Sequence, residues 1–218
     1  MSAREVSIPL DGIRLSGELD FSKTGRSLVL FAHGSGSSRH SPRNQFVAQT
    51  LRQAGLGTFL FDLMTREEEE AEADTRHLRF NIELLAKRLL AATNWVLGSY
   101  NPGGLSVGYF GSSTGAAAAL IGAAELGRPI KAVVSRGGRP DLAGTALEHV
   151  KAATLLIVGG DDTEVIPLNQ KAYDRLPCQK AFRLIPGATH LFEEPGALET
   201  VATLAADWFT RNFCRDSG

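Results

Sequence analysis

The chain has 218 residues, of which 43% are hydrophobic and 22% are charged, and its formal net charge is −1. These values are typical of soluble globular proteins and exclude disordered, collagen-like and membrane-array proteins. A net charge this close to zero offers no electrostatic basis for binding nucleic acid or an anionic membrane, so we expect a small-molecule partner.

Length and cysteine content narrow the class further. The length suits a single α/β domain over residues 1–218. Cys178 and Cys214 are far apart and show no metal-ligand spacing, which favours a reduced compartment. No segment has the length and apolarity of a signal peptide or a membrane span. We therefore expect a soluble, cytoplasmic protein and leave its oligomeric state open.

The chain is predicted to open with an antiparallel hairpin. Residues 6–10 and 13–19 are rich in alternating apolar side chains, and Asp11-Gly12 between them is a strong hairpin-turn signal. Continuous apolar runs then predict buried strands at 27–33, 57–62, 105–111, 130–135, 154–159 and 180–186. Helical spacing predicts helices from Pro42 to Gly55 and over 77–97, 116–126, 167–176 and 196–213.

This alternation of strands and helices predicts a mostly parallel sheet of about eight strands with helices on both faces. In such sheets ligands bind beyond the carboxyl ends of the strands, so chemistry is expected in the residues that follow each strand. The acidic run Glu67 to Asp74 follows the strand at 57–62, and we interpret it as a solvated loop or helix start.

The segment Gly111-Ser112-Ser113-Thr114-Gly115 matches the G-x-S-x-G nucleophile elbow. A serine hydroxyl is a weak nucleophile, and the elbow presents it openly at a sharp turn from strand to helix. The predicted strand before the motif and the predicted helix after it supply that context. The motif spacing selects Ser113 over Ser112 as the nucleophile. A glycine–serine turn without chemistry is the alternative.

A serine nucleophile needs a base, and in this arrangement an acid and then a histidine follow the serine along the chain. Only His149 and His190 come after Ser113. His149 falls in a predicted helix, whereas His190 follows the strand at 180–186 and a turn. His190 is therefore the predicted base.

The acid is expected after a strand that lies between serine and histidine. Asp161 and Asp162 follow the strand at 154–159 directly. A shift of one residue only reverses the direction of the side chain, so the pattern by itself does not choose between them.

Two backbone N–H groups are expected to hold the oxyanion. One belongs to Thr114, directly after the nucleophile, and the other to Ser35, in the glycine-rich loop at 33–38. His33 is expected to anchor that loop through its ring. A phosphate-binding loop is the alternative, but the segment lacks the spacing and lysine of a P-loop.

With HGSG, GSSTG, GGDD and GATH in this order, the chain resembles the α/β-hydrolase superfamily. It is most similar to small bacterial proteins of the dienelactone-hydrolase group, and the resemblance runs from residue 27 to 213. The family's acid motif maps onto Gly159, Asp162, Val165 and Pro167, which implies that Asp162 is the acid.

Two departures from the family pattern limit what carries over. Dienelactone hydrolases proper use a cysteine nucleophile, whereas position 113 is serine, so their lactone substrate does not transfer. Many relatives carry a cap domain between the sixth and seventh strands. Here residues 135–153 suffice for one helix, so we expect no large cap and an open site.

Three arginines follow strand ends near the predicted site. Arg136 follows the strand at 130–135, and Arg39 and Arg43 follow the oxyanion loop. Arginine pairs well with carboxylate or phosphate, so any of them could meet an anionic substrate group. Solvated surface charge is the simpler interpretation. Arg136 is kept as the candidate substrate-binding residue.

These residues predict a carboxylesterase-like hydrolase. Ser113, deprotonated by His190, would attack the carbonyl of an ester, lactone or thioester and form an acyl-enzyme. No metal or organic cofactor is expected. An acyltransferase with the same triad is the nearest alternative. A non-catalytic ligand-binding protein of this fold would lack a triad member, and none is missing.

Overall fold

The computed structural model describes residues 3–21, 26–75, 78, 80–100 and 104–214. Its first two strands, β1 (Arg4–Leu10) and β2 (Ile13–Asp20), form the predicted antiparallel hairpin. The turn between them is made by Asp11 and Gly12, both with positive φ. Such φ values are what asparagine, aspartate and glycine tolerate in tight hairpin turns.

The other strands complete an eight-stranded sheet in the order β1-β2-β4-β3-β5-β6-β7-β8. They are β3 (Ser27–Ala32), β4 (Gly57–Phe61), β5 (Ser106–Ser112), β6 (Ile130–Arg136), β7 (Ala153–Gly159) and β8 (Lys180–Ile185). Strand β2 pairs antiparallel with β4, and the strands from β4 across to β8 run parallel. The predicted sheet is confirmed.

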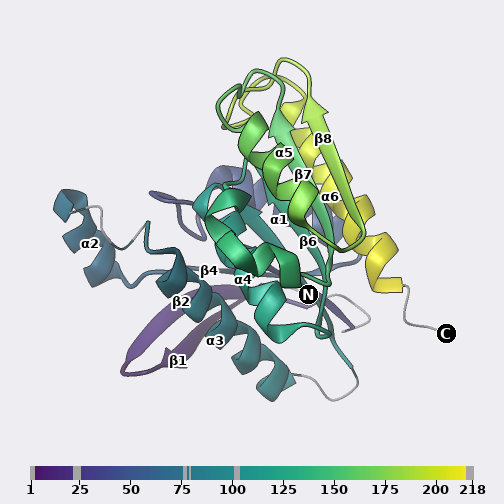
Figure 1. Cartoon of the computed structure of the whole chain (residues 1–218). Helices are drawn as coiled ribbons and strands as arrows, with labels where there is room; N and C mark the ends of the chain where they lie inside the picture. The colour runs from purple at the N-terminus through teal and green to yellow at the C-terminus, as the bar shows by residue number, and fades with distance from the viewer. Residues whose placement is uncertain (1–2, 22–25, 76–77, 79, 101–103, 215–218) are drawn as a thin grey trace.

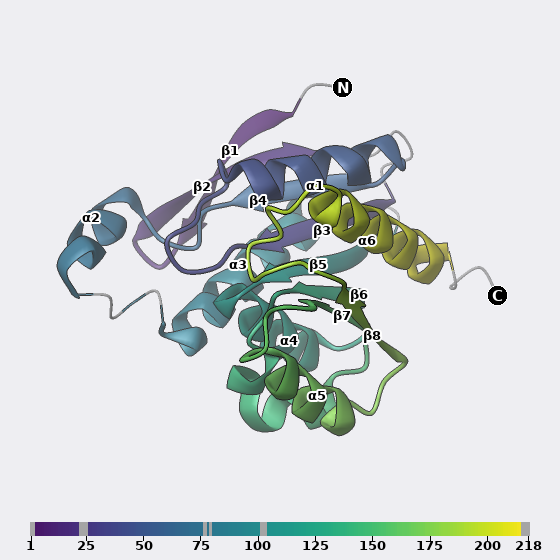
Figure 2. The same cartoon turned by 90° about the horizontal axis from the view of Figure 1, so that it is seen from above.

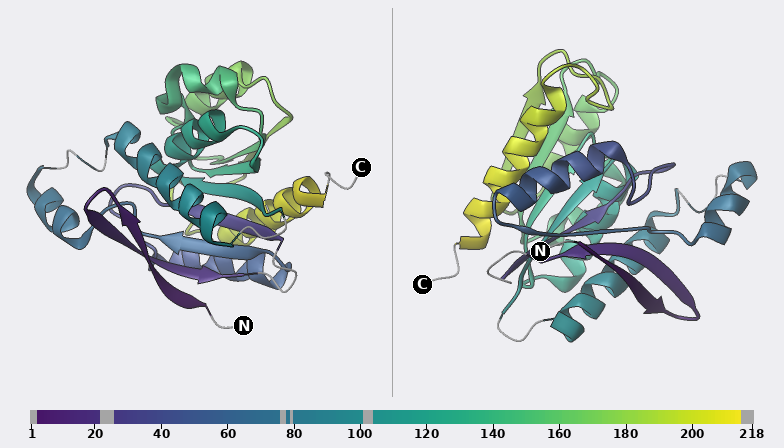
Figure 3. Two further views of the ribbon diagram at one scale, coloured as in Figure 1. Left: turned by 90° about the horizontal axis from the view of Figure 1, so that it is seen from below. Right: turned by 180° about the vertical axis from the view of Figure 1, so that it is seen from behind.

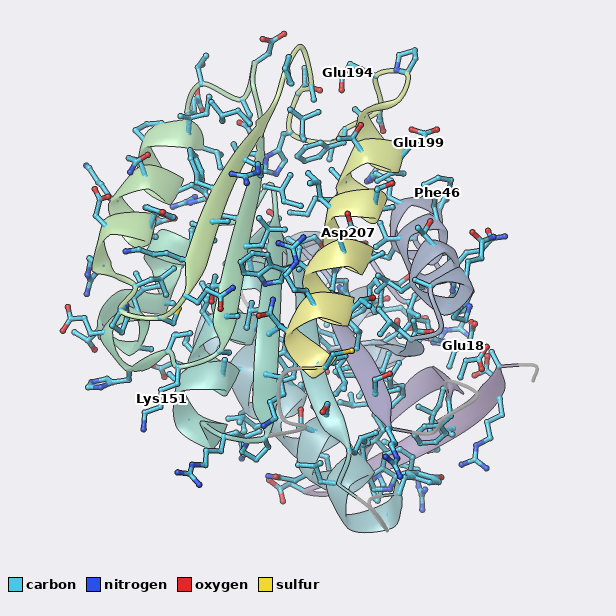
Figure 4. The ribbon with its side chains drawn as sticks, turned by 90° about the vertical axis from the view of Figure 1, so that its right-hand side faces the viewer. Glu18, Phe46, Lys151, Glu194, Glu199 and Asp207 are labelled. Atoms are coloured by element: carbon cyan, nitrogen blue, oxygen red, sulfur yellow. The ribbon has the colours of Figure 1, made fainter. Side chains whose placement is uncertain are left out.

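Helices cover both faces of this sheet (Figures 1 and 2). On one face lie α1 (Pro42–Gln53) and α6 (Ala197–Phe213), packed side by side (Figure 3). Phe46 of α1 packs on the apolar cluster of this face (Figure 4). On the other face lie α3 (Ile82–Tyr100), α4 (Thr114–Leu126), α5 (Ile166–Arg175) and the 3₁₀ helix η1 (Pro140–His149).

The apolar runs are buried because each parallel strand faces helices on both sides. Leu30, Tyr109 and Val133 contribute to the cluster under α3 and α4. Phe31, Phe110 and Val134, their neighbours along the chain, contribute to the cluster under α1 and α6. Continuous hydrophobic runs therefore fill two cores, one on each face of the sheet.

Between β4 and β5 the acidic run starts a helix, one of the two forms expected for it, but the long helix begins later than predicted. The acidic run forms a helix of its own, α2 (Arg66–Thr75), which stands away from the sheet (Figure 1). The long helix begins at Ile82 and not at residue 77, because the Asn81 side chain accepts a hydrogen bond from the Leu84 N–H, 3.0 Å away, in the manner of an N-cap. Residues 76, 77 and 79 lie outside the described residues.

The connection between β6 and β7 is short, as expected. It holds only η1, which bends at Gly144 with a φ of 56°. No cap domain is inserted there. Among the helices of the described ranges, none has the length and apolarity needed to cross a membrane.

Candidate active site

The nucleophile elbow has the geometry that its sequence predicts. Strand β5 ends at Ser112 and α4 begins at Thr114, which leaves Ser113 at the apex with φ 50° and ψ −124°. This is a strained conformation for a residue with a side chain. A Cβ on Gly111 would lie 2.5 Å from the Cα of Ala116, and one on Gly115 would lie 2.1 Å from the carbonyl oxygen of Ala32. Both glycines are therefore required by close backbone approach.

The predicted acid and base lie in direct contact. His190 Nδ1 is 2.7 Å from Asp162 Oδ2, with the Asp162 side chain 10% exposed and the His190 side chain 38% exposed. Asp161 is exposed, and its backbone N–H donates to the carbonyl oxygen of Ala188. Asp162, and not its neighbour, is thus the aspartate that orients the imidazole.

The Ser113 hydroxyl makes no hydrogen bond with His190 among the described residues of this structure. Hydrogen bonds between nucleophile and base are often long in free enzymes and shorten when substrate binds. The elbow brings Ser113 to the end of β5, and the loop after β8 brings His190 across the end of β6. Both residues therefore lie at the carboxyl edge of the sheet.

Gly137 lets the backbone of the His190 loop approach the end of β6 closely. The sequence pattern did not single out this glycine. A Cβ on Gly137 would lie 3.0 Å from the His190 carbonyl oxygen and 3.2 Å from the ring of Phe192. The φ of Gly137 is 49°, which further favours glycine. The signal available in the sequence is the Gly137-Gly138 pair directly after a strand.

The oxyanion loop lies against the nucleophile. A Cβ on Gly34 would lie 2.9 Å from the Cβ of Ser113 and 3.0 Å from the carbonyl oxygen of Ser112. The Ser35 N–H, the predicted second oxyanion donor, donates to Thr114 Oγ1 at 3.2 Å, and the hydroxyls of Ser35 and Thr114 are also 3.2 Å apart. An oxyanion would therefore share or replace the Thr114 hydroxyl as the acceptor of this N–H.

His33 anchors the oxyanion loop, as predicted. Its Nε2 accepts a hydrogen bond from the Leu63 N–H at 2.9 Å, so its Nδ1 carries the proton and donates to the Gly34 carbonyl oxygen at 3.0 Å. Burial lowers the pKa of His33, which keeps the ring in this neutral form. The ring thereby joins the ends of β3 and β4.

A cavity of about 530 Å³ opens beside the oxyanion loop. It is lined by residues 33–38 and 40–43 together with Met64, Glu69 and Leu85. Ser113, Asp162 and His190 do not line it, but Gly34 and Ser35 separate it from the nucleophile by one loop.

The interpretation as solvated surface charge is wrong for Arg136, whereas Arg39 and Arg43 are partly buried and form ion pairs. Arg136 is only 7% exposed. Arg39 pairs with Asp62, and Arg43 Nη1 lies 2.8 Å from Glu193 Oε1. Burial, together with the positive charge of Arg43, lowers the pKa of Arg136 to about 10.

Within the described ranges, no group of three or more histidine, cysteine, aspartate or glutamate side chains could hold a metal ion. The polar groups of the site are instead the Ser113 elbow, the Asp162–His190 pair and the backbone donors of two loops. These are the parts that nucleophilic acyl chemistry requires.

No family model matches the chain. The chain is 52% identical over 210 residues to a protein of Mycobacterium tuberculosis named "Putative phosphoribosyl transferase". The alignment covers 96% of this chain but 46% of that relative, so the chain spans about half the length of the mycobacterial protein.

Two solved structures extend the comparison. A dienelactone hydrolase from Anabaena variabilis is 55% identical, with a TM-score of 0.93, and the match covers 97% of this chain and 99% of that one. Est1E from Butyrivibrio proteoclasticus is 16% identical, with a TM-score of 0.80 over 97% of this chain and 99% of its own, and shows the fold alone. Identity above one half over the whole of a solved homologue establishes the family. The chain belongs to the α/β-hydrolase superfamily and, within it, to the dienelactone-hydrolase-like proteins.

Proposed function

We propose that the chain is a serine hydrolase that cleaves a carboxylic ester, or a related lactone or thioester, through an acyl-enzyme on Ser113. The observation that carries the proposal is the 2.7 Å contact between His190 and Asp162 beside the strained Ser113 elbow. The name of the dienelactone hydrolase relative, which describes cleavage of a cyclic ester, supports the same class of reaction.

In this mechanism Asp162 holds the His190 ring with its Nδ1–H directed at the carboxylate, so that Nε2 is the basic nitrogen. His190 takes the proton of Ser113 as the serine oxygen attacks the acyl carbonyl. The backbone N–H groups of Thr114 and Ser35 stabilise the oxyanion of the tetrahedral intermediate. His190 then gives its proton to the leaving alcohol, and the carbon–oxygen bond of the ester breaks.

Deacylation reverses these proton transfers with water as the nucleophile. His190 takes a proton from water as the water attacks the acyl-enzyme, and then returns a proton to Ser113 Oγ as the acid leaves. An acyltransferase would use an alcohol in place of water at this step. Product analysis with and without an added alcohol separates the two reactions.

The name of the mycobacterial relative gives no second candidate for this chain. That name describes a protein about twice as long, and 46% of it aligns here. The elbow and the aspartate–histidine pair of this chain favour acyl chemistry.

Replacement of Ser113 tests the proposal. Ser113→Ala should fold normally but lose turnover of 4-nitrophenyl esters by about 10⁴-fold or more, because no acyl-enzyme can form. Covalent labelling by a fluorophosphonate should disappear in the same variant. Ser112→Ala is the matched control and should still be labelled. Persistent labelling of Ser113→Ala would show that another residue is the nucleophile.

A further inference from the structure

Strand β6 ends in Arg136, whose guanidinium group is buried and forms no ion pair with any residue that the structure describes. Arg136 is 7% exposed, and its Nε and Nη1 are buried with no hydrogen-bond partner among the described residues. Arg88, which is 4% exposed, shows how the same fold satisfies a buried arginine: it donates to the carbonyl oxygen of Leu63 and to the carboxylate of Glu68. An unpaired buried charge is costly, so Arg136 requires an explanation.

The charged neighbour that perturbs Arg136 is a second arginine. Arg43, in the first turn of α1, lies close enough to lower the pKa of Arg136. Its Nε is also buried without a partner, while its Nη1 is held by Glu193, whose side chain is 64% exposed. Two neighbouring guanidinium groups thus have buried N–H donors that no described residue accepts.

This arginine pair adjoins the predicted site. Arg136 lies opposite Ser112 in the register of β5 and β6, and its carbonyl oxygen accepts the Ser113 N–H at 3.4 Å. Arg43 lines the cavity of about 530 Å³ together with Ser35. The loop that carries Glu193 lies at the start of α6, where Figure 4 shows its neighbour Glu194. Arg136 therefore lies beside the end of the nucleophile strand, and its neighbour Arg43 lies at the cavity.

We propose that Arg136 and Arg43 form a subsite for an anionic group, a carboxylate or a phosphate, carried by the substrate. This inference rests on the proposed function, because it names the class of ester that Ser113 would attack. Guanidinium groups bind both anions with charge-assisted hydrogen bonds. The anion would take up the unpartnered Nε and Nη1 donors of Arg136, and Glu193, being largely in solvent, can release Arg43 toward it.

Binding is tested in the Ser113→Ala background, so that it does not depend on turnover. Inorganic phosphate and acetate are titrated by calorimetry, which also distinguishes the two anions. Arg136→Met should lower the affinity for the more tightly bound of the two anions by about 10–100-fold. This is the loss expected when a hydrogen bond to a charged group is removed. Arg175→Met is the matched control, because Arg175 is an exposed arginine that pairs with Glu148. Equal affinities in Arg136→Met and its parent would overturn the inference.

A stability measurement separates this subsite from a structural role. If Arg136 lacks a partner in the free protein, Arg136→Met removes an unpaired buried charge, and Tm should stay constant or rise. A fall in Tm of Arg136→Met, with Arg136→Lys restoring it, would identify a structural residue and contradict the proposal.

Substrate selectivity gives the final test. The ratio of kcat/KM for 4-nitrophenyl hemisuccinate to that for 4-nitrophenyl pentanoate should fall by about 10–100-fold in Arg136→Met, and less in Arg136→Lys. A 4-nitrophenyl ester of phosphonoacetate serves as the substrate with a phosphate-like group in the same comparison. An equal loss of kcat/KM for the charged and the neutral ester would overturn the proposal of an anion subsite. If the parent protein cleaves no ester but Ser113→Ala binds the anion through Arg136, the proposed function fails and the anion site stands.

Discussion

Two strand ends of this molecule each present a histidine, and the two rings are held in opposite ways. His33, after β3, is 6% exposed, and both its nitrogens bond to backbone groups of Leu63 and Gly34. His190, after β8, has a side chain that is 38% exposed, and its Nδ1 bonds to the Asp162 carboxylate. Position after a strand is common to both, so position alone does not indicate chemistry.

The difference lies in what remains available on each ring. With both nitrogens committed to the backbone, His33 has no site for a transferred proton and can only hold two loops together. His190 bonds to a carboxylate through Nδ1, which would stabilise the imidazolium in its proposed role as a base. The partners of the ring nitrogens therefore distinguish the anchor from the proposed base.

The largest expected effect comes from removing the proposed base. His190→Gln should lower turnover of 4-nitrophenyl esters by about 10⁴-fold or more, because Ser113 loses its proton acceptor. Far-UV circular dichroism should not change. His149→Gln, at an exposed position on η1, should retain normal turnover. Loss of activity in the His149 variant instead would reverse the assignment.

The carboxylate partner comes next. Asp162→Asn should cost about 10⁴-fold in turnover, because an amide no longer holds the correct tautomer of His190. Asp161→Asn is the adjacent control, and its effect should be much smaller since Asp161 is exposed. Equal losses in the two variants would show that both residues shape the loop and that the contact at 2.7 Å is not decisive.

Gly137 tests whether the His190 loop must be held tightly. In Gly137→Ala the new Cβ would meet the His190 carbonyl oxygen at 3.0 Å, so the loop must move. A displacement of this kind should reduce turnover by about 10²-fold. Gly144→Ala is the matched control, because Gly144 has a similar φ of 56° but no atom within 4 Å of its Cβ position. A comparable loss of turnover in both would assign the effect to backbone strain.

Replacement of Thr114 tests the position of the oxyanion loop and should have a smaller effect on turnover. Thr114→Val removes the acceptor of the Ser35 N–H and should lower kcat by about 10-fold or less, with Thr114→Ser restoring it. KM should change little if the hydroxyl only positions the loop. A rise in kcat would mean that the hydroxyl competes with the oxyanion for Ser35.

The smallest effect concerns the anchor and its dependence on pH. The pKa of His33 is lowered by burial, partly opposed by its bond to Gly34 and by Asp62, so the unfolded chain binds a proton more readily than the native protein. Stability is then unaffected by His33 at high pH and decreases as pH falls below about 6.5, the ordinary value for histidine. Urea unfolding between pH 7 and 5 should show a shallower loss in His33→Gln than in the parent. Parallel curves would contradict a neutral buried ring.

Local patterns in the sequence determined much of this protein. The hairpin at Asp11-Gly12, the alternation of strands and helices, and the elbow at Ser113 follow from backbone sterics and burial over a few residues, and all three are present in the structure. The pattern left Asp161 and Asp162 equivalent, and the family resemblance selected Asp162, which is the aspartate that contacts His190.

Tertiary structure alone decided the features that depend on residues distant in the chain. Arginine is usually a surface residue, yet Arg136 is buried near Arg43, which lies 93 residues earlier in the chain. Gly137 is constrained by His190, and the Ser35 N–H by Thr114. Such contacts carry no local periodicity, because they arise only when separate strand ends are brought to one edge of the sheet.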